Sequence, residues 1–361
     1  MSDFLQQMAA SSHERLNAAK RACSEAALLQ KALATAPPPA LTADPARFDL
    51  IAELKLRSPA VGQLKSSDED VEGRVTTYAR AGAAAVSVLT EPSRFDGSMK
   101  HLETATQALA PLKVPAMRKD FLVDPYQVIE ARVAGAGGVL VILRMLPRAG
   151  IEALLDCARS LGLFVLLEAF DEADIEAMHD VIGTKAQRGP STQPDTTQPT
   201  APSQSTAPVL AGLNCRDLTT LQIVPQRLIG LAHLLPTNVP RVAESGVASP
   251  DDAARVAEVG YEYALVGSAL MQGGDPHALA AAMLHAGRAS ARRNQQTFPR
   301  ATRATSPSAT SPAATSPAAT SPSAASPTAA SPTAASPIAA SPTAVSPIAA
   351  PPTAPPSRRT P

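Results

Sequence analysis

The chain has 361 residues, with 32 basic (Lys and Arg) and 32 acidic (Asp and Glu) side chains, and 35 prolines. The balanced charge excludes the overall positive field that gathers nucleic acid or anionic membranes, and no apolar run is long enough to span a bilayer. Its three cysteines are far apart and lack the spacing of a disulfide framework or a structural zinc site, which favours a reducing cytoplasm. We therefore expect a cytoplasmic protein whose partner is a small molecule.

Residues 1–47 are expected to form a short helical extension. The first part, MSDFLQQMAASSHERLNAAKRACSEAALL, carries charges throughout and has no continuous apolar core. It therefore indicates neither a secretory signal nor a membrane anchor.

From residue 48 to residue 295, short apolar runs alternate with helical stretches, a pattern typical of parallel sheets. Eight runs are expected to be strands: Asp49–Glu53, Ala85–Leu89, Val114–Arg118, Val139–Leu143, Leu163–Glu168, Val209–Leu213, Arg241–Glu244 and Tyr263–Val266. Eight strand–helix units over about 240 residues predict an α/β fold of the (β/α)8 TIM-barrel type. A doubly wound open sheet is less favoured, because no GxGxxG follows the first run.

Two low-complexity segments interrupt or follow the barrel. Residues 184–208, TKAQRGPSTQPDTTQPTAPSQSTAP, are expected to be a surface-loop insertion before the sixth strand, on the side of the barrel opposite the site. Residues 296–361 are built on a repeat of Ser-Pro and alanine. Frequent proline and small side chains cannot support a packed core, so this part is expected to be a disordered tail.

Groups able to do chemistry gather where the expected strands end. The candidates are Glu53, Lys55, Lys119, Glu168, Asn214 and Glu244. Because the active sites of TIM barrels lie at the carboxyl ends of the strands, these side chains should meet at one mouth. Alternation along the first strand sends Glu53 and Lys55 to the same side, where burial and opposite charge shift the pKa of each.

A phosphate site is expected after the last two strands. Ser245-Gly246 and Gly267-Ser268 lie where barrels commonly bind phosphate through backbone N–H groups. The pattern therefore predicts a phosphorylated small-molecule substrate, although glycine also serves ordinary strand exits.

Seven segments between about Phe48 and Pro276 resemble the indole-3-glycerol phosphate synthase family: IAELKLRSP, VSVLTEPSRFDGS, MRKDFLVDPYQVIEARVAGAGGVLVIL, LLEAFDEADI, GLNCRDL, AESGV and LVGSALM. The resemblance implies conversion of 1-(2-carboxyphenylamino)-1-deoxyribulose 5-phosphate to indole-3-glycerol phosphate, carbon dioxide and water, as a step of tryptophan biosynthesis. It implies neither a metal nor an organic cofactor. A monomer is expected, and other enzymes of the pathway are candidate partners.

The resemblance also assigns roles to residues. The catalytic set is Glu53, Lys55, Lys119, Glu168, Asn214, Glu244 and Ser245, and the substrate- and phosphate-binding set is Ser58, Arg216, Gly246, Gly267 and Ser268. Lys119 is the candidate acid that protonates the substrate ketone, and Lys55 pairs with a substrate anion and assists loss of the hydroxyl, although the division between the two lysines stays open. Glu168 is expected to take the ring proton, while Glu53 and Asn214 hold the lysines and the substrate hydroxyls.

The chain departs from the family pattern in two places. Ala60-Val61 replaces a small polar residue and a lysine after the Ser-Pro of the first loop, and the segment leading into the first strand looks shorter than usual. Cys215, between two site residues, is expected to pack rather than react, because no histidine motif accompanies it.

Two other functions stay open at this point. One is a Schiff-base aldolase or sugar-phosphate isomerase with Lys119 as the amine nucleophile. The other is an inactive barrel whose Ser-Pro tail is the functional part.

Overall fold

The computed structural model describes residues 2–44, 46, 48–66, 68–187, 208–272 and 274–297. Most of the expected insertion and nearly all of the expected tail lie outside these residues. The prediction of a disordered tail therefore also falls outside the described residues. The helix α8 (Glu172–Gln187) continues into the first residues of the expected insertion.

Eight parallel strands form a closed barrel, which confirms the expected fold class. The strands are β1 (Asp49–Leu54), β4 (Ala85–Leu89), β5 (Ala116–Lys119), β6 (Gly138–Ile142), β7 (Phe164–Ala169), β8 (Val209–Asn214), β9 (Arg241–Glu244) and β10 (Tyr263–Val266). Strand β5 starts two residues later than expected, because Pro115 has no N–H to donate to the ladder. Pairing of β1 with both β4 and β10 closes the cylinder.

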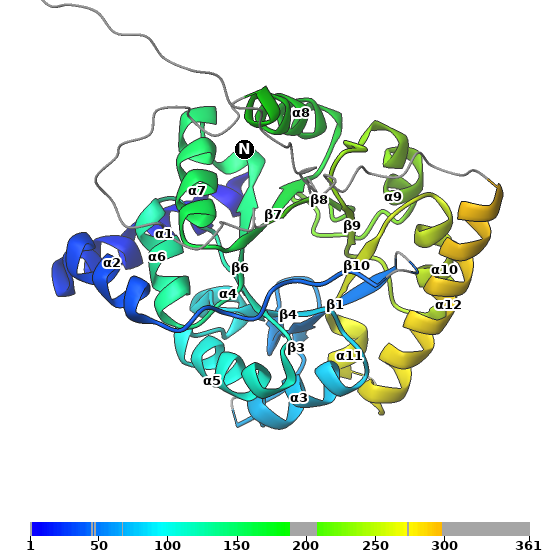
Figure 1. Cartoon of the computed structure of the whole chain (residues 1–361), viewed down its shortest axis with the longest axis horizontal. Coiled ribbons are helices and arrows are strands. Elements are labelled where there is room, and N and C mark those ends of the chain that lie inside the picture. Colours follow the sequence, from blue (N-terminus) through cyan, green and yellow to red (C-terminus); the bar gives the residue numbers. More distant parts are fainter. Residues whose placement is uncertain are drawn as a thin grey trace, which may run out of the picture. The chain divides into compact units, whose positions relative to one another are not determined.

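Helices surround the strands on the outside (Figure 1). They are α3 (Val71–Arg80), α4 (Pro92–Phe95), α5 (Met99–Leu109), α6 (Pro125–Val133), α7 (Arg148–Ser160), α8, α9 (Gln226–Gly230), α10 (Pro250–Glu258), α11 (Ser268–Gln272) and α12 (Pro276–Thr297), with 3-10 turns at Ala110–Leu112, Leu143–Met145 and Ala232–Leu234. Side-chain caps define several starts. Ser249, for example, accepts from the backbone N–H of Asp252, whose carboxylate accepts from the N–H of Ser249 in return.

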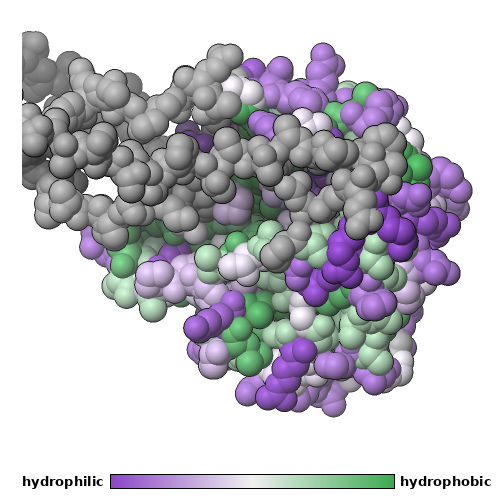
Figure 2. All heavy atoms as spheres, turned by 45° about the vertical axis from the view of Figure 1, so that its right-hand side comes forward, coloured by the Kyte–Doolittle hydropathy of each residue, from purple (hydrophilic) through white to green (hydrophobic). Residues whose placement is uncertain are grey.

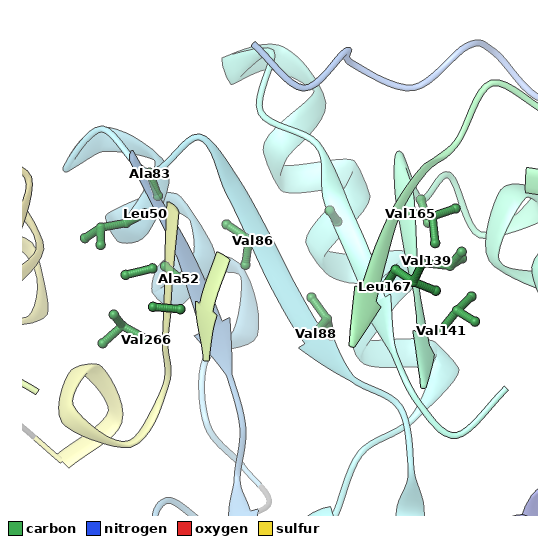
Figure 3. Close-up of a cluster of buried hydrophobic side chains, with 14 of the residues drawn as sticks. Leu50, Ala52, Ala83, Val86, Val88, Val139, Val141, Val165, Leu167 and Val266 are labelled. Carbon is green, nitrogen blue, oxygen red and sulfur yellow. The ribbon is translucent and has the colours of Figure 1, made fainter. Parts of the chain in front are cut away.

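Alternate residues of each strand face two different apolar layers. Val86, Val139 and Val165 belong to the layer between strands and helices, part of which is drawn in Figure 3. The intervening residues point into the barrel, where Leu166 and Phe164 pack with their counterparts on other strands. Because this alternation has a period of two, the residue two places beyond an interior leucine is also directed inward.

The amino-terminal extension is present as two helices, α1 (Asp3–Ala22) and α2 (Glu25–Ala34). Helix α1 is tied to the barrel by two hydrogen bonds of 2.8 Å each from the guanidinium of Arg15 to the carboxylate of Asp120. The hydroxyl of Tyr126, on α6, donates to backbone carbonyls at the end of α1. The extension is therefore packed onto the barrel.

The outer surface carries hydrophilic and apolar side chains side by side, as Figure 2 shows for the face that includes α10 and α12. Within the described ranges, no helix combines the length and the apolar character needed to cross a membrane.

Candidate active site

The twelve residues expected at the site all line one pocket at the carboxyl ends of the strands. Their direction follows from the alternation along each strand. Ile51, Leu166 and Val242 fill the barrel interior, and Glu53, Glu168 and Glu244 stand two residues further along the same strands. The structure thus brings together the groups that the sequence places far apart, while their catalytic roles stay predictions.

Lys119 stands between two buried carboxyl groups. Its Nζ lies 3.8 Å from Oε1 of Glu168 and 3.8 Å from Oε2 of Glu244. Burial alone would lower the pKa of Lys119, but Glu168, Glu244 and Glu53 together raise the pKa above the ordinary lysine value. Lys119 is therefore a stable ammonium at neutral pH, and its contacts are long enough to be exchanged for a substrate oxygen.

Glu53 and Lys55 form a tighter pair. Nζ of Lys55 donates to Oε1 of Glu53 at 2.6 Å. Burial would raise the pKa of Glu53, but the charges of Lys55 and Lys119 and the hydrogen bond from Lys55 lower the pKa below its usual range. A Cβ at Gly267 would lie 2.4 Å from Oε1 of Glu53, so glycine leaves the room that this carboxylate occupies.

Asn214 connects Glu168 to the loop after β8. Its Oδ1 accepts from the backbone N–H of Arg216 at 3.0 Å, which leaves the amide nitrogen to donate to Oε1 of Glu168 at 2.7 Å. Nη1 of Arg216 in turn donates to the carbonyl of Leu221 at 2.7 Å, and Leu221 has a φ of 59°. This strained backbone holds a guanidinium at the rim of the pocket.

The expected phosphate-binding residues gather on one side of the pocket. Ser58 lies in a two-stranded hairpin of β2 (Arg57–Ser58) and β3 (Gly62–Gln63) that follows β1. Ser245 and Gly246 have φ values of 63° and 72°, and Ser268 begins α11. Consecutive left-handed residues and a helix start both direct backbone N–H groups toward an anion.

The opposite side of the pocket is apolar and was not anticipated from the sequence. It is lined by Phe4, Leu5, Phe95, Phe121, Leu140, Ile142 and Phe170. The ring of Phe121 packs edge-on against Phe4 of α1 and tilted against Phe95, with centroid separations of 5.9 and 6.0 Å. Phe95 and Phe121 closely follow the ends of β4 and β5, so the strand-end rule could have identified them, whereas nothing in the sequence pattern points to Phe4.

The altered first loop is an ordered hairpin at the mouth. Ala60 lines the pocket, and Val61 is 51% exposed. Cys215 is buried, and burial raises the pKa of its thiol to about 11, so the thiol stays protonated at neutral pH. The burial and the raised pKa of Cys215 agree with a packing role for this residue.

In the part of the chain that the structure describes, no cluster of His, Cys, Asp and Glu has the arrangement of a metal site. The chemistry that the predicted catalytic residues can support is that of two partly exposed ammonium groups, of Lys55 and Lys119, beside the three carboxyl groups of Glu53, Glu168 and Glu244 in one pocket.

The comparisons with known proteins cover most of the described chain. The family model described as indole-3-glycerol phosphate synthase matches residues 5–186 and 197–283. This match includes α1 and α2, which the motifs had left outside the resemblance, and its interruption falls within the expected insertion.

Curated relatives agree with this match. The indole-3-glycerol phosphate synthase of Nocardioides sp. (strain ATCC BAA-499 / JS614) is 39% identical over 73% of this chain and 91% of its own length. That of Parafrankia sp. (strain EAN1pec) is 37% identical over 67% and 79%, and that of Mycobacterium leprae (strain Br4923) is 35% identical over 75% and 90%. The chain belongs to the indole-3-glycerol phosphate synthase family.

Proposed function

We propose that this chain converts 1-(2-carboxyphenylamino)-1-deoxyribulose 5-phosphate to indole-3-glycerol phosphate, carbon dioxide and water. The observation that carries the proposal is the ammonium of Lys119, held between Glu168 and Glu244 at the mouth of the barrel. Ring closure needs a proton donor at the substrate ketone, and a buried ammonium supplies both the proton and a positive charge for the developing oxyanion.

The two sides of the pocket match the two ends of the substrate. The turns at Ser245-Gly246 and Gly267-Ser268, with Ser58, suit the phosphate, and the rings of Phe95 and Phe121 suit the aromatic amine. A substrate bound in this way places its ketone between the two ends, at the level of Lys119 and Glu168.

The reaction then follows in three steps. The ring carbon that bears the carboxylate attacks the ketone carbon, and Lys119 protonates the ketone oxygen to a hydroxyl. The carboxylate leaves as carbon dioxide, and its bonding electrons return to the ring. Loss of the hydroxyl as water, assisted by Lys55, and of a proton from the new ring to Glu168 completes the indole.

Lys119 is poorly suited to the alternative role of Schiff-base nucleophile. An amine must be neutral to attack a carbonyl, and the neighbouring carboxyl groups keep the pKa of Lys119 above its ordinary value. Borohydride reduction in the presence of a keto-sugar phosphate should therefore leave no covalent adduct.

The test is formation of the fluorescent indole product by the purified full chain. Lys119→Met should lower kcat/KM by at least about 10²-fold, because it removes the proton donor and its charge. Lys100→Met is the matched control, since that lysine side chain is 75% exposed on α5. Absence of product with the wild-type chain, or equal rates for Lys119→Met and wild type, would reject the proposal.

We also propose that the enzyme works as a monomer in the cytoplasm, beside other enzymes of the same pathway. The three cysteines, which lack the spacing of a disulfide framework or a zinc site, support the cytoplasmic location. A sedimentation experiment that finds a single larger assembly of identical chains would contradict the monomer.

A further inference from the structure

Glu244 is the least satisfied charged group of the site. The residue is 1% exposed, and neither of its carboxyl oxygens has a hydrogen-bond partner among the residues that the structure describes. A buried carboxylate without donors costs several kcal/mol, so such groups normally keep a proton instead.

The groups around Glu244 are few and come from several strands. Glu168 on β7, Lys119 on β5 and Glu53 on β1 are the charged groups that act on it. Its partners on the adjacent strands, Asn214 and Leu265, carry no charge. Nζ of Lys119 lies 3.8 Å from Oε2 of Glu244. Within this group, one ammonium is therefore shared among the three carboxyl groups of Glu53, Glu168 and Glu244.

Glu168 is the better stabilised of the two acids. The amide of Asn214 donates to its Oε1 at 2.7 Å, and this amide has a fixed orientation because its oxygen accepts from Arg216 N–H. Donors that point at an oxygen favour the charged form of the acid. Glu244 has no such donor in the described part of the chain, so a proton shared between the two acids belongs on Glu244.

Gly212 explains how the two acids come together. It pairs with Glu168 on one side and with Val242 on the other, so it lies on the strand between β7 and β9. A Cβ at Gly212 would lie 2.3 Å from Oε1 of Glu244. The carboxyl group of Glu244 therefore occupies the space that any side chain at position 212 would fill, directly beside Glu168.

We infer that Glu244 is a neutral acid in the working enzyme and donates its proton as a hydrogen bond to the carboxylate of Glu168. Glu168 then carries the negative charge of the pair and remains the base that accepts the ring proton. Burial, followed by the charge of Glu168, raises the pKa of Glu244 well above its ordinary value, and Lys119 opposes this shift only in part.

The assignment also sets the charge of the pocket. With Glu244 neutral, the cations Lys55, Lys119 and Arg216 outnumber the anions Glu53 and Glu168 by one, and the other carboxylate of the pocket lining, Asp120, is paired with Arg15 and Arg118. An excess positive charge suits a substrate that carries both a phosphate and a carboxylate. The fit of the charge to the substrate and the role of Glu168 as the base rest on the proposed function, whereas the protonation of Glu244 is a property of the free protein.

Infrared spectroscopy of the full chain tests the protonation without substrate. At pH 7.5, the difference spectrum between wild type and Glu244→Gln should contain the carbonyl band of a neutral carboxylic acid, which the variant lacks. Glu103→Gln is the control, because the side chain of Glu103 on α5 is 46% exposed and lies outside the pocket, and its difference spectrum should show only carboxylate bands. A carboxylate band in place of the neutral one for Glu244 would overturn the inference, whether or not the wild type turns over.

Kinetics test the division of roles. The amide of Glu244→Gln can still donate to Glu168, so its kcat/KM at pH 7.5 should fall less than that of Glu168→Gln, which should lose at least about 10²-fold. Wild type should lose activity at alkaline pH as Glu244 ionises, and Glu244→Gln should lack this decline. Equal losses for the two folded variants would contradict the assignment of the proton to Glu244, and failure of wild type alone would count against the proposed function.

Discussion

Two charged clusters lie on either side of strand β5 and differ in how well their members are paired. On the outer side, the carboxylate of Asp120 accepts from Arg15, Arg118, Thr90 and the N–H of Phe121, at distances of 2.7 to 3.1 Å. On the inner side, Lys119 has no carboxyl oxygen nearer than 3.8 Å in the described structure. Lys119, the last residue of β5, thus belongs to an open network, and Asp120, directly after it, belongs to a closed one.

The two clusters differ in their physical role. A buried charge with all its partners in place holds elements together, and here it fastens α1, which carries Phe4 and Leu5, to the strand of the active-site lysine. A buried charge with long contacts is poised for a ligand, because it loses little when the substrate replaces its partners.

The largest effect is expected from opening the closed network. Asp120→Ala removes the buried carboxylate that Arg15 and Arg118 share, although Arg118 keeps its contact with Glu130, and should lower the free energy of unfolding by up to about 3–5 kcal/mol. Urea denaturation of the full chain measures this loss. A loss below about 1 kcal/mol would show that the outer network contributes little to stability.

A somewhat smaller effect, on activity instead of stability, is expected from Lys55→Met. Removal of this cation should lower kcat/KM by about 10²-fold, the usual cost of one stabilising group at a reacting centre. The fold should tolerate the change better than Asp120→Ala, because Glu53 still faces Lys119 and Arg216. Steady-state rates and urea denaturation curves on the same preparation separate a loss of activity from a loss of stability. A Lys55→Met variant that is strongly destabilised but keeps the wild-type kcat/KM would contradict this prediction.

The pH should affect the two clusters in opposite directions. Burial would raise the pKa of Asp120, but Arg118 and Arg15 lower it below its ordinary value. Its contribution to stability is therefore present above about pH 4 and is lost as the pH falls below that value. The pKa of Glu244 is raised in the folded protein, so the unfolded chain releases this proton at a lower pH than the folded protein does. Between the two pKa values, the free energy of unfolding therefore falls by up to about 1.4 kcal/mol for each pH unit by which the pH rises.

Unfolding curves between acid and mildly alkaline pH measure both trends. The advantage of wild type over Asp120→Asn should shrink below pH 4. Glu244→Gln should gain stability relative to wild type as the pH rises. If the difference in the free energy of unfolding between Glu244→Gln and wild type does not change with pH, the predicted opposite pH trends of Asp120 and Glu244 are wrong.

The smallest effect is expected from an exposed ion pair. Nζ of Lys100 lies 3.4 Å from Oε2 of Glu103, and both side chains are largely in water. Lys100→Ala should change the free energy of unfolding by less than about 0.5 kcal/mol. This value provides the baseline for the two buried clusters, and a loss as large as that of Asp120→Ala would show that burial is not the deciding factor.

Much of the barrel could be predicted from local pattern. Short apolar runs, separated by helical segments, predicted eight strands whose limits are within two residues of those observed, and Pro115 accounts for the late start of β5. The site residues followed from the rule that parallel strands end at one rim, since Glu168 and Glu244 each end or nearly end their strands. These features depend on neighbours along the chain, which a sequence displays directly.

The rest depends on groups that are distant in sequence. Arg15 and Asp120 are separated by 105 positions, so their pairing could not be predicted from spacing. The same holds for the wall that Phe4 adds to the pocket and for the space at Gly212 that receives Glu244.

By itself, then, the order of residues determined the architecture, the rim at which the polar groups meet and the family motifs, because each is encoded by local periodicity and position on a strand. Which charges are paired, which stay open and which acid keeps a proton follow from the packing of residues that are far apart along the chain. Those properties depend on distance and burial in three dimensions, and the free energy of a buried charge changes by several kcal/mol with a single donor.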